Sequence, residues 1–231
     1  MILLRRIGNV LSCCAPIFCV TIYFLSPSLA RATTKGLSQI VTPDLQPAGD
    51  FSLSLQVQDR KIGNPFQLQS ELGLTNWLEV AVFQGLSPGE TIFGAEVGLI
   101  QKLPWLVSVG VINWSTRGGG PTYFGEVGYY TDTHKLIAGA AQVGGRTQAI
   151  LGYAYDFNKR WRAQLDFQSG NGNSVTAGFT CNVTDSFQFN PAVYFTNESP
   201  HKFLGYIVFT YTFPLWNAKK KPAPSAPPSA R

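Results

Sequence analysis

The segment that most constrains this chain is a strongly alternating stretch near the C-terminus, from Phe203 to Phe213. One face of an extended strand would carry Phe203, Ile207, Phe209, Tyr211 and Phe213, and the other Tyr206, Thr210 and Thr212, with Leu204 and Val208 as apolar exceptions. A strand face this aromatic needs a non-aqueous neighbour. Pro214 then predicts the end of the strand. We therefore expect a β-sheet protein that this strand closes.

The same alternation continues backwards to Asp50. It predicts about twelve strands, around residues 50–58, 66–74, 78–82, 93–99, 105–111, 123–129, 135–143, 149–157, 161–168, 175–181, 187–195 and 203–213. Short turn signals such as Gly170-Asn171-Gly172-Asn173 separate them. Small residues leave the facing of 135–143 open, and Pro191 indicates a bulge or a weaker strand. No helical pattern competes with this all-β fold class.

Aromatic alternation that closes on Phe213 resembles the last strand of Gram-negative outer-membrane β-barrels. The resemblance covers Asp50 to Phe213 and identifies no subfamily. It implies a closed antiparallel transmembrane β-barrel of the bacterial outer membrane, with short turns and both termini in the periplasm. It also implies that Phe209, Tyr211 and Phe213 form an assembly signal, which the barrel assembly machinery would read. A soluble β-sandwich or lipocalin-like barrel would alternate too, but its apolar face would be internal.

Aromatic residues gather at two levels of the expected barrel. Trp77, Trp105, Trp161, Phe187 and Phe213 lie near the periplasmic turns, and Trp114 lies near the other end. Outer-membrane barrels carry aromatic girdles at both membrane interfaces. We therefore expect these six residues to contact outer-membrane lipid at the two interfaces.

The two ends of the chain differ from the middle. Residues 1–32 combine Arg5 and Arg6, an apolar run and small residues before Ala32, which predicts a secretory signal peptide rather than a membrane anchor. Residues 33–49 contain two prolines and no periodicity, so we expect a periplasmic lead-in. Residues 214–231 are rich in proline and lysine, which predicts a disordered periplasmic tail. The tail could contact peptidoglycan or a periplasmic protein, or be solvated only.

Charge and cysteine content exclude several classes of protein. The net charge of +5 comes from the leader and the tail, and the region between them is slightly acidic, so we expect no nucleic-acid partner. Cys181 would be the single cysteine after leader removal, which excludes an intramolecular disulfide. His134 and His201 fall at opposite ends of the barrel, so they cannot share a metal or a catalytic relay. We therefore expect no enzyme, no catalytic residue, no metal and no cofactor.

Charged residues on the expected inner face suggest what the lumen does. Glu71 and Glu79 flank one turn, near enough to repel each other. The inward acids and bases together are Glu71, Glu79, Glu96, Glu126, Arg162 and Asp166. Arg162 falls about six strands from the glutamates, which predicts acid and base on opposite walls, as in a porin constriction. The alternative is salt bridging inside a filled barrel.

Two functions remain open. The first is a narrow passive channel for small polar solutes or ions. Besides the charges above, seven glutamines would line it: Gln56, Gln67, Gln69, Gln148, Gln164, Gln168 and Gln188. The second is a non-conducting structural or interaction barrel. The expected outer loops are short, which argues against a receptor or adhesin and leaves no loop long enough to fold in as a large plug. Twelve strands enclose a lumen of intermediate size, so size does not decide.

Overall fold

The described part of the chain forms twelve antiparallel strands, as the alternation predicted. The computed structural model describes residues 36–118 and 120–216. The strands are β1 (Asp50–Gln58), β2 (Phe66–Thr75), β3 (Leu78–Leu86), β4 (Gly89–Lys102), β5 (Trp105–Ser115), β6 (Thr122–Tyr130), β7 (His134–Val143), β8 (Arg146–Asp156), β9 (Trp161–Gln168), β10 (Ser174–Asn182), β11 (Phe187–Thr196) and β12 (Phe203–Pro214). The predicted signal peptide and residues 217–231 of the predicted tail lie outside the described residues.

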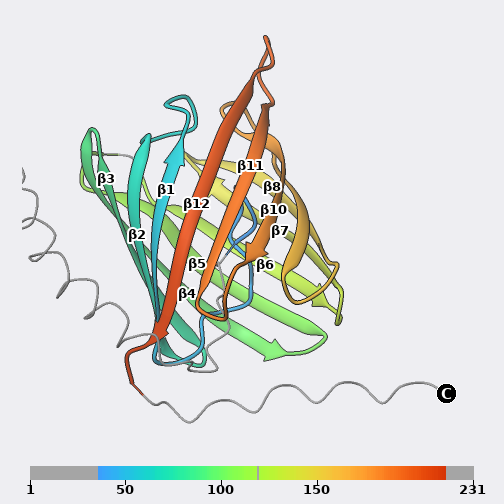
Figure 1. Cartoon of the computed structure of the whole chain (residues 1–231). Helices are drawn as coiled ribbons and strands as arrows, with labels where there is room; N and C mark the ends of the chain where they lie inside the picture. The colour runs from blue at the N-terminus through green and yellow to red at the C-terminus, as the bar shows by residue number, and fades with distance from the viewer. Residues whose placement is uncertain (1–35, 119, 217–231) are drawn as a thin grey trace, which may run out of the picture.

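The strands close into a single barrel (Figure 1). Each strand pairs with its neighbour in the sequence, and β12 closes the ring by pairing with β1, from Asp50 opposite Pro214 to Gln58 opposite Tyr206. Phe203–Phe213 is therefore the closing strand, as predicted. We call the end of the barrel that holds Asp50 and Pro214 the terminal end, and the opposite end the distal end. Among the described residues, no helix is both long enough and apolar enough to cross a membrane.

The side chains alternate between an apolar exterior and a mostly polar interior. Along β9, Leu165 is 52% exposed on the outer face, whereas Gln164 and Asp166 are buried on the inner face. Leu204 and Val208, the two apolar exceptions of β12, are buried inside the barrel. The structure also shows which face of β7 points inwards. Ile137 and Ala141 are buried on the inner face, and Leu136 is exposed on the outer face.

Residues 36–49, which we call the inserted segment, lie inside the barrel (Figure 1). They contact inner faces all around the ring, including Asp166 on β9, Glu79 on β3 and Tyr130 on β6. Residues 36–49 of the expected periplasmic lead-in therefore lie inside the barrel rather than before it. The segment can fill the lumen although its sequence has no periodicity, because inner-face residues of the barrel supply hydrogen-bond partners for its backbone.

Candidate functional site

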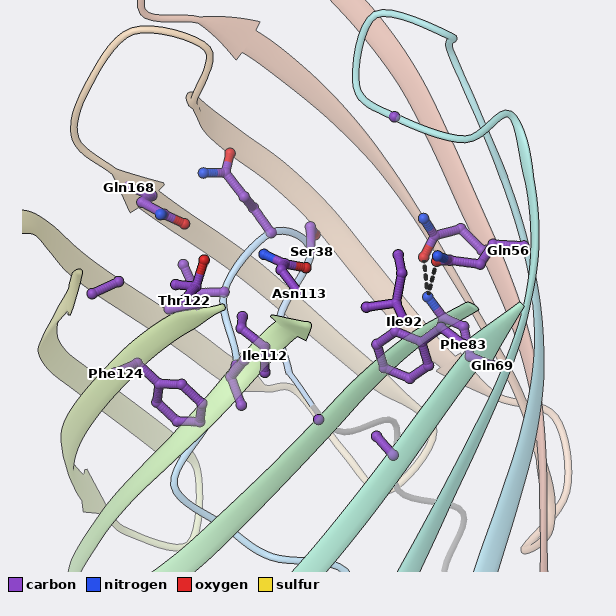
Figure 2. A pocket seen from close by; sticks show the side chains of 18 of the residues that line it. Ser38, Gln56, Gln69, Phe83, Ile92, Ile112, Asn113, Thr122, Phe124 and Gln168 are labelled. Atoms are coloured by element: carbon purple, nitrogen blue, oxygen red, sulfur yellow. Dashed lines mark hydrogen bonds between the residues drawn. The ribbon is translucent and has the colours of Figure 1, made fainter. Parts of the chain in front are cut away.

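A cavity of about 480 Å³ occupies the lumen between the inserted segment and the distal mouth (Figure 2). Its lining runs from Leu37–Val41 at one end to Ile62–Asn64 and Asn113 at the distal mouth. Phe83, Ile92, Ile112 and Phe124 supply an apolar part of the lining, on β3 to β6. The cavity is thus a vestibule, with the inserted segment as its floor.

Two groups of amide side chains face each other across this vestibule. Gln69 Nε2 donates hydrogen bonds to Gln56 Oε1 at 2.6 Å and to Gln67 Oε1 at 2.9 Å (Figure 2). On the opposite side of the ring, Gln168 Nε2 donates to Gln148 Oε1 at 2.6 Å. These glutamines were predicted to line the lumen, and their mutual hydrogen bonds hold them in fixed orientations.

The inserted segment is anchored to the barrel through its backbone. The Ser38 N–H donates to Asp166 Oδ2 at 2.6 Å, and the Tyr194 hydroxyl donates to the Ser38 carbonyl oxygen at 2.5 Å. Nearer the terminal end, the Gln46 N–H donates to Glu79 Oε2 at 2.7 Å. Two wall carboxylates thus bind the backbone of the inserted segment as acceptors.

Asp44 forms a further anchor at the terminal end. Lys135 Nζ lies 2.9 Å from Asp44 Oδ2, and the Tyr130 hydroxyl donates to Asp44 Oδ1 at 2.7 Å. Burial by itself would raise the pKa of Asp44, but the Lys135 charge and the Tyr130 hydrogen bond outweigh it, so the pKa lies below its ordinary value. Asp44 therefore stays ionised and paired while the segment is in place.

This lowered pKa predicts a pH dependence of stability. A carboxylate whose pKa is lower in the folded state stabilises that state above its unfolded pKa, and the contribution falls as the pH drops below the ordinary value of 3.8. We expect Asp44→Asn to unfold more easily than the parent protein at neutral pH, and the difference to shrink progressively below about pH 4. Denaturant unfolding of both proteins at several pH values measures this. A difference that grows on acidification would contradict it.

The two sides of the lumen around the inserted segment differ in chemistry. Leu37 and Ile40 pack against an apolar wall on β5 to β8. This wall consists of Leu106, Phe124, Tyr130, Ile137, Ala141, Ile150 and Ala154. The opposite side, on β10 to β12 and β1, is a polar wall of Ser52, Ser54, Thr176, Thr180, Gln188, Asn190, Thr210 and Thr212. Each of these polar residues is at most 5% exposed, so this wall is buried while the segment is in place.

The structure brings most of the predicted lumen acids to one region. Glu79, Glu96 and Glu126 are buried on the inner faces of β3, β4 and β6, and all three line the cavity, as does Glu71. The strand register places Glu79 directly opposite Glu96, whereas Glu71 stands opposite Ala81. In the described part of the chain, no group of three His, Cys, Asp or Glu side chains is arranged to hold a metal ion.

Arg162 does not stand alone on the opposite wall. Its Nε and Nη2 atoms donate to the two carboxylate oxygens of Asp156 at 2.7 and 3.1 Å. Asp156 lies on the neighbouring strand β8, directly opposite Arg162 in the register, and was not among the predicted lumen charges. The predicted field between opposite walls stays a prediction, but this pairing favours the alternative of salt bridging inside a filled barrel.

The predicted aromatic residues lie at the strand ends. Trp77, Trp105 and Trp161 are exposed at the terminal end, and Trp114 is exposed at the distal end. Phe187 begins β11 and Phe213 lies at the end of β12; both are half-buried. The rings of Tyr211 and Phe213 lie on the outer face of β12 with their centroids 5.8 Å apart, and Phe209 lies farther along this face. Membrane contact and the assembly signal stay predictions.

A closed barrel with an apolar exterior and a polar lumen has the architecture of outer-membrane porins, and similar solved structures exist. A KdgM porin aligns with a TM-score of 0.51 at 12% identity, over 71% of this chain and 99% of that chain. A KdgM porin in complex with disordered oligogalacturonate (TM-score 0.49, 13% identity, 71% and 99%) and a NanC porin (0.46, 9%, 71% and 98%) are also similar.

These comparisons show a fold. The predicted resemblance to Gram-negative outer-membrane β-barrels is confirmed at the level of the fold, a closed barrel of twelve strands, and the subfamily is not identified. No protein-family model and no curated protein matches the sequence. Identities this low carry no solute or residue role from those porins to this chain, so its function must be argued from its own lumen.

Sequence reasoning missed the inserted segment, including Asp44, and its partners Tyr130, Lys135 and Tyr194. One signal was available. Gly73, Gly128, Gly152 and Gly178 all fall at inward-facing strand positions, where a porin lumen would usually carry polar side chains. Such glycines indicate that another part of the chain approaches the wall closely.

Proposed function

We propose that this protein is a passive channel of the bacterial outer membrane for small polar solutes, with a lumen narrowed by residues 36–49. Both termini would lie in the periplasm, because an even number of strands returns the chain to the side where it entered. The exposed apolar side chains around the whole barrel support a lipid environment, because a soluble protein rarely exposes a continuous apolar surface.

One observation carries the transport proposal. The cavity of about 480 Å³ lies inside a closed wall, reaches the distal mouth and carries amide and carboxylate side chains. A purely structural barrel of this size has no need for a polar vestibule, because its inner residues could fill the lumen. The vestibule is large enough for several waters or a small solute.

The charge of the vestibule favours cations. Glu71, Glu79, Glu96 and Glu126 all line it, together with Glu90. The inward-facing cations Lys135 and Arg162 are paired with Asp44 and Asp156 nearer the terminal end. A low-dielectric wall focuses the field of these carboxylates into the lumen. We therefore propose small cations and neutral polar solutes as the permeating class, and we expect polyanions such as oligogalacturonate to be disfavoured.

Ion selectivity tests this proposal directly. In a planar bilayer with a salt gradient, the mature protein should show small discrete conductance steps and a reversal potential on the cation side. Replacing Glu96 and Glu126 together by glutamine should shift the reversal potential towards zero, because it removes two carboxylates at nearly constant volume. Gln69→Glu, which adds a carboxylate to the same vestibule, is the matched opposite variant. Anion selectivity in the parent protein would contradict the proposal.

A non-conducting interaction barrel is the second candidate, and the inserted segment supports it. Leu37 and Ile40 fill the lumen beside the apolar wall, and the polar wall behind the segment is buried. A folded protein that stays electrically silent at all voltages, and also after the segment is loosened, would favour this candidate.

The remaining expectations are proposals about the ends of the chain. Removal of a leader after about Ala32 would leave a mature chain that begins shortly before the inserted segment. Residues 217–231 would extend into the periplasm, where lysines and prolines could contact peptidoglycan or a periplasmic protein. The barrel assembly machinery would recognise the end of β12. Mass spectrometry of the purified protein tests the cleavage position.

A further inference from the structure

The inserted segment is not a strand of the β-sheet. Its backbone-to-backbone hydrogen bonds lie at its base, where the Gly49 N–H donates to the Gly73 carbonyl oxygen at 2.8 Å, and within itself, from Leu37 N–H to the Ile40 carbonyl oxygen at 3.1 Å. The ladder of β1 begins only at Asp50. Because the barrel closes through β1 and β12 alone, the segment can leave the lumen without breaking any strand pairing.

The wall is shaped to receive the segment. A Cβ atom at Gly73 would lie 2.2 Å from the Pro47 carbonyl oxygen, and one at Gly152 would lie 2.7 Å from Ile40 Cδ1. A Cβ atom at Gly178 would lie 2.7 Å from the Pro191 carbonyl oxygen of the neighbouring strand and 3.0 Å from Ser38 Oγ. The three glycines lie on β2, β8 and β10, on separate parts of the ring. Together with the carboxylates that bind its backbone, they form a built binding site for an extended peptide.

The polar wall behind the segment is suited to water. Asn190 is fully buried, and neither of its side-chain amide atoms has a hydrogen-bond partner among the described residues. A buried amide without a partner is unfavourable, and it gains hydrogen bonds when water reaches it. Ser52 and Thr212, which share a hydrogen bond at 2.8 Å, belong to the same wall. Removing the segment would therefore expose a hydrophilic surface on this side.

We propose that the lumen lined by these glycines and carboxylates is a peptide-binding site, and that residues 36–49 of the same chain are its releasable occupant. Their release widens the channel. This proposal rests on the proposed function in its last step only. Asp44, Ser38 and Gln46 bind the wall, and Gly49, whose φ of 87° favours glycine, joins the segment to β1. The occupied site corresponds to the narrowed lumen.

Covalent capture of the released segment tests this proposal in the full-length mature protein. Gln39→Cys is introduced in a Cys181→Ala background, because the Gln39 amide has no hydrogen-bond partner among the described residues. The reagent is a maleimide coupled to a folded carrier protein too large to enter the lumen. Asn171→Cys, in the exposed β9–β10 turn, is the control for the reactivity of the reagent.

We expect slow capture of the Gln39→Cys variant in its folded form. Adding Asp44→Asn, which removes a charge-assisted contact, should accelerate it about tenfold or more. Capture of the Asn171→Cys control should not change. Heat-modified gel mobility verifies that each variant is folded. Capture that occurs only after denaturation, with and without Asp44→Asn, would overturn the proposal.

Conductance of the captured protein separates this proposal from the proposed function. Larger steps after capture support both. If the segment is captured but no conductance steps are recorded, the segment is releasable, and both its effect on the channel and the channel function are overturned. Unchanged conductance steps after capture would show that the segment does not limit the lumen, which would overturn the gating role.

Discussion

Replacing Leu37 and Ile40 together by aspartate is expected to raise the single-channel conductance several-fold. Both side chains are 4% exposed and pack against the apolar wall of β5 to β8. A buried, uncompensated carboxylate is destabilising by about 3–5 kcal/mol. Two of them exceed the roughly 5.5 kcal/mol that moves a two-state equilibrium from 99:1 to 1:99. The segment should therefore leave its site, while the barrel, whose strand pairing is untouched, should remain folded.

Single-channel recording measures this effect, and heat-modified gel mobility verifies the fold. Pro47→Asp is the matched control, because Pro47 lies on the same segment but is exposed, so the added charge remains solvated. We expect the control to keep the parental conductance. Parental conductance in the double variant, with the barrel folded, would mean that the segment does not limit ion flow.

The barrel could be predicted because it depends on a repeated local signal. Alternation with a period of two places Leu165 outside and Gln164 inside whatever the neighbouring strands are. The β7 register could not be predicted in this way, because Ala138, Ala140 and Ala141 satisfy either face. The inward face of β7 is the one that carries Ile137, because Ile137 packs in the same apolar cluster as Leu37. Where the local pattern fits either face of a strand, tertiary packing determines which face is buried.

The site was predicted less completely, because its key contacts join residues far apart in the sequence. Asp44 and Lys135 have no local pattern that pairs them, and Arg162 pairs with Asp156 rather than with the glutamates across the lumen. Inward residues could be identified from alternation, but which of them meet depends on the ring order and on what fills the lumen. Gly152 carried the strongest hint, because an inward glycine leaves room for another segment.

The membrane environment predicts a second large effect, which depends on depth. Leu165 lies in the middle of β9 and points outwards, and Phe203 lies at the distal start of β12, 76% exposed. An arginine on the lipid face of a β-barrel is destabilising by about 2–4 kcal/mol at the bilayer midplane but only about 0–1 kcal/mol near the interface. We therefore expect Leu165→Arg to lower the free energy of unfolding by about 2–4 kcal/mol, and Phe203→Arg to have a much smaller effect.

Reversible denaturant unfolding in lipid vesicles, followed by tryptophan fluorescence, measures both values. The comparison is diagnostic because both positions are exposed in the isolated barrel, and exposed substitutions in a soluble protein usually change stability by less than about 0.5 kcal/mol. A soluble barrel would thus tolerate both arginines equally. Leu165→Asn, polar but uncharged, should fall between the parent and Leu165→Arg, because the penalty at the midplane increases with the cost of desolvating the side chain. Equal and small effects at both positions would contradict a lipid-facing role of the outer surface. They would also contradict the proposed location in the outer membrane.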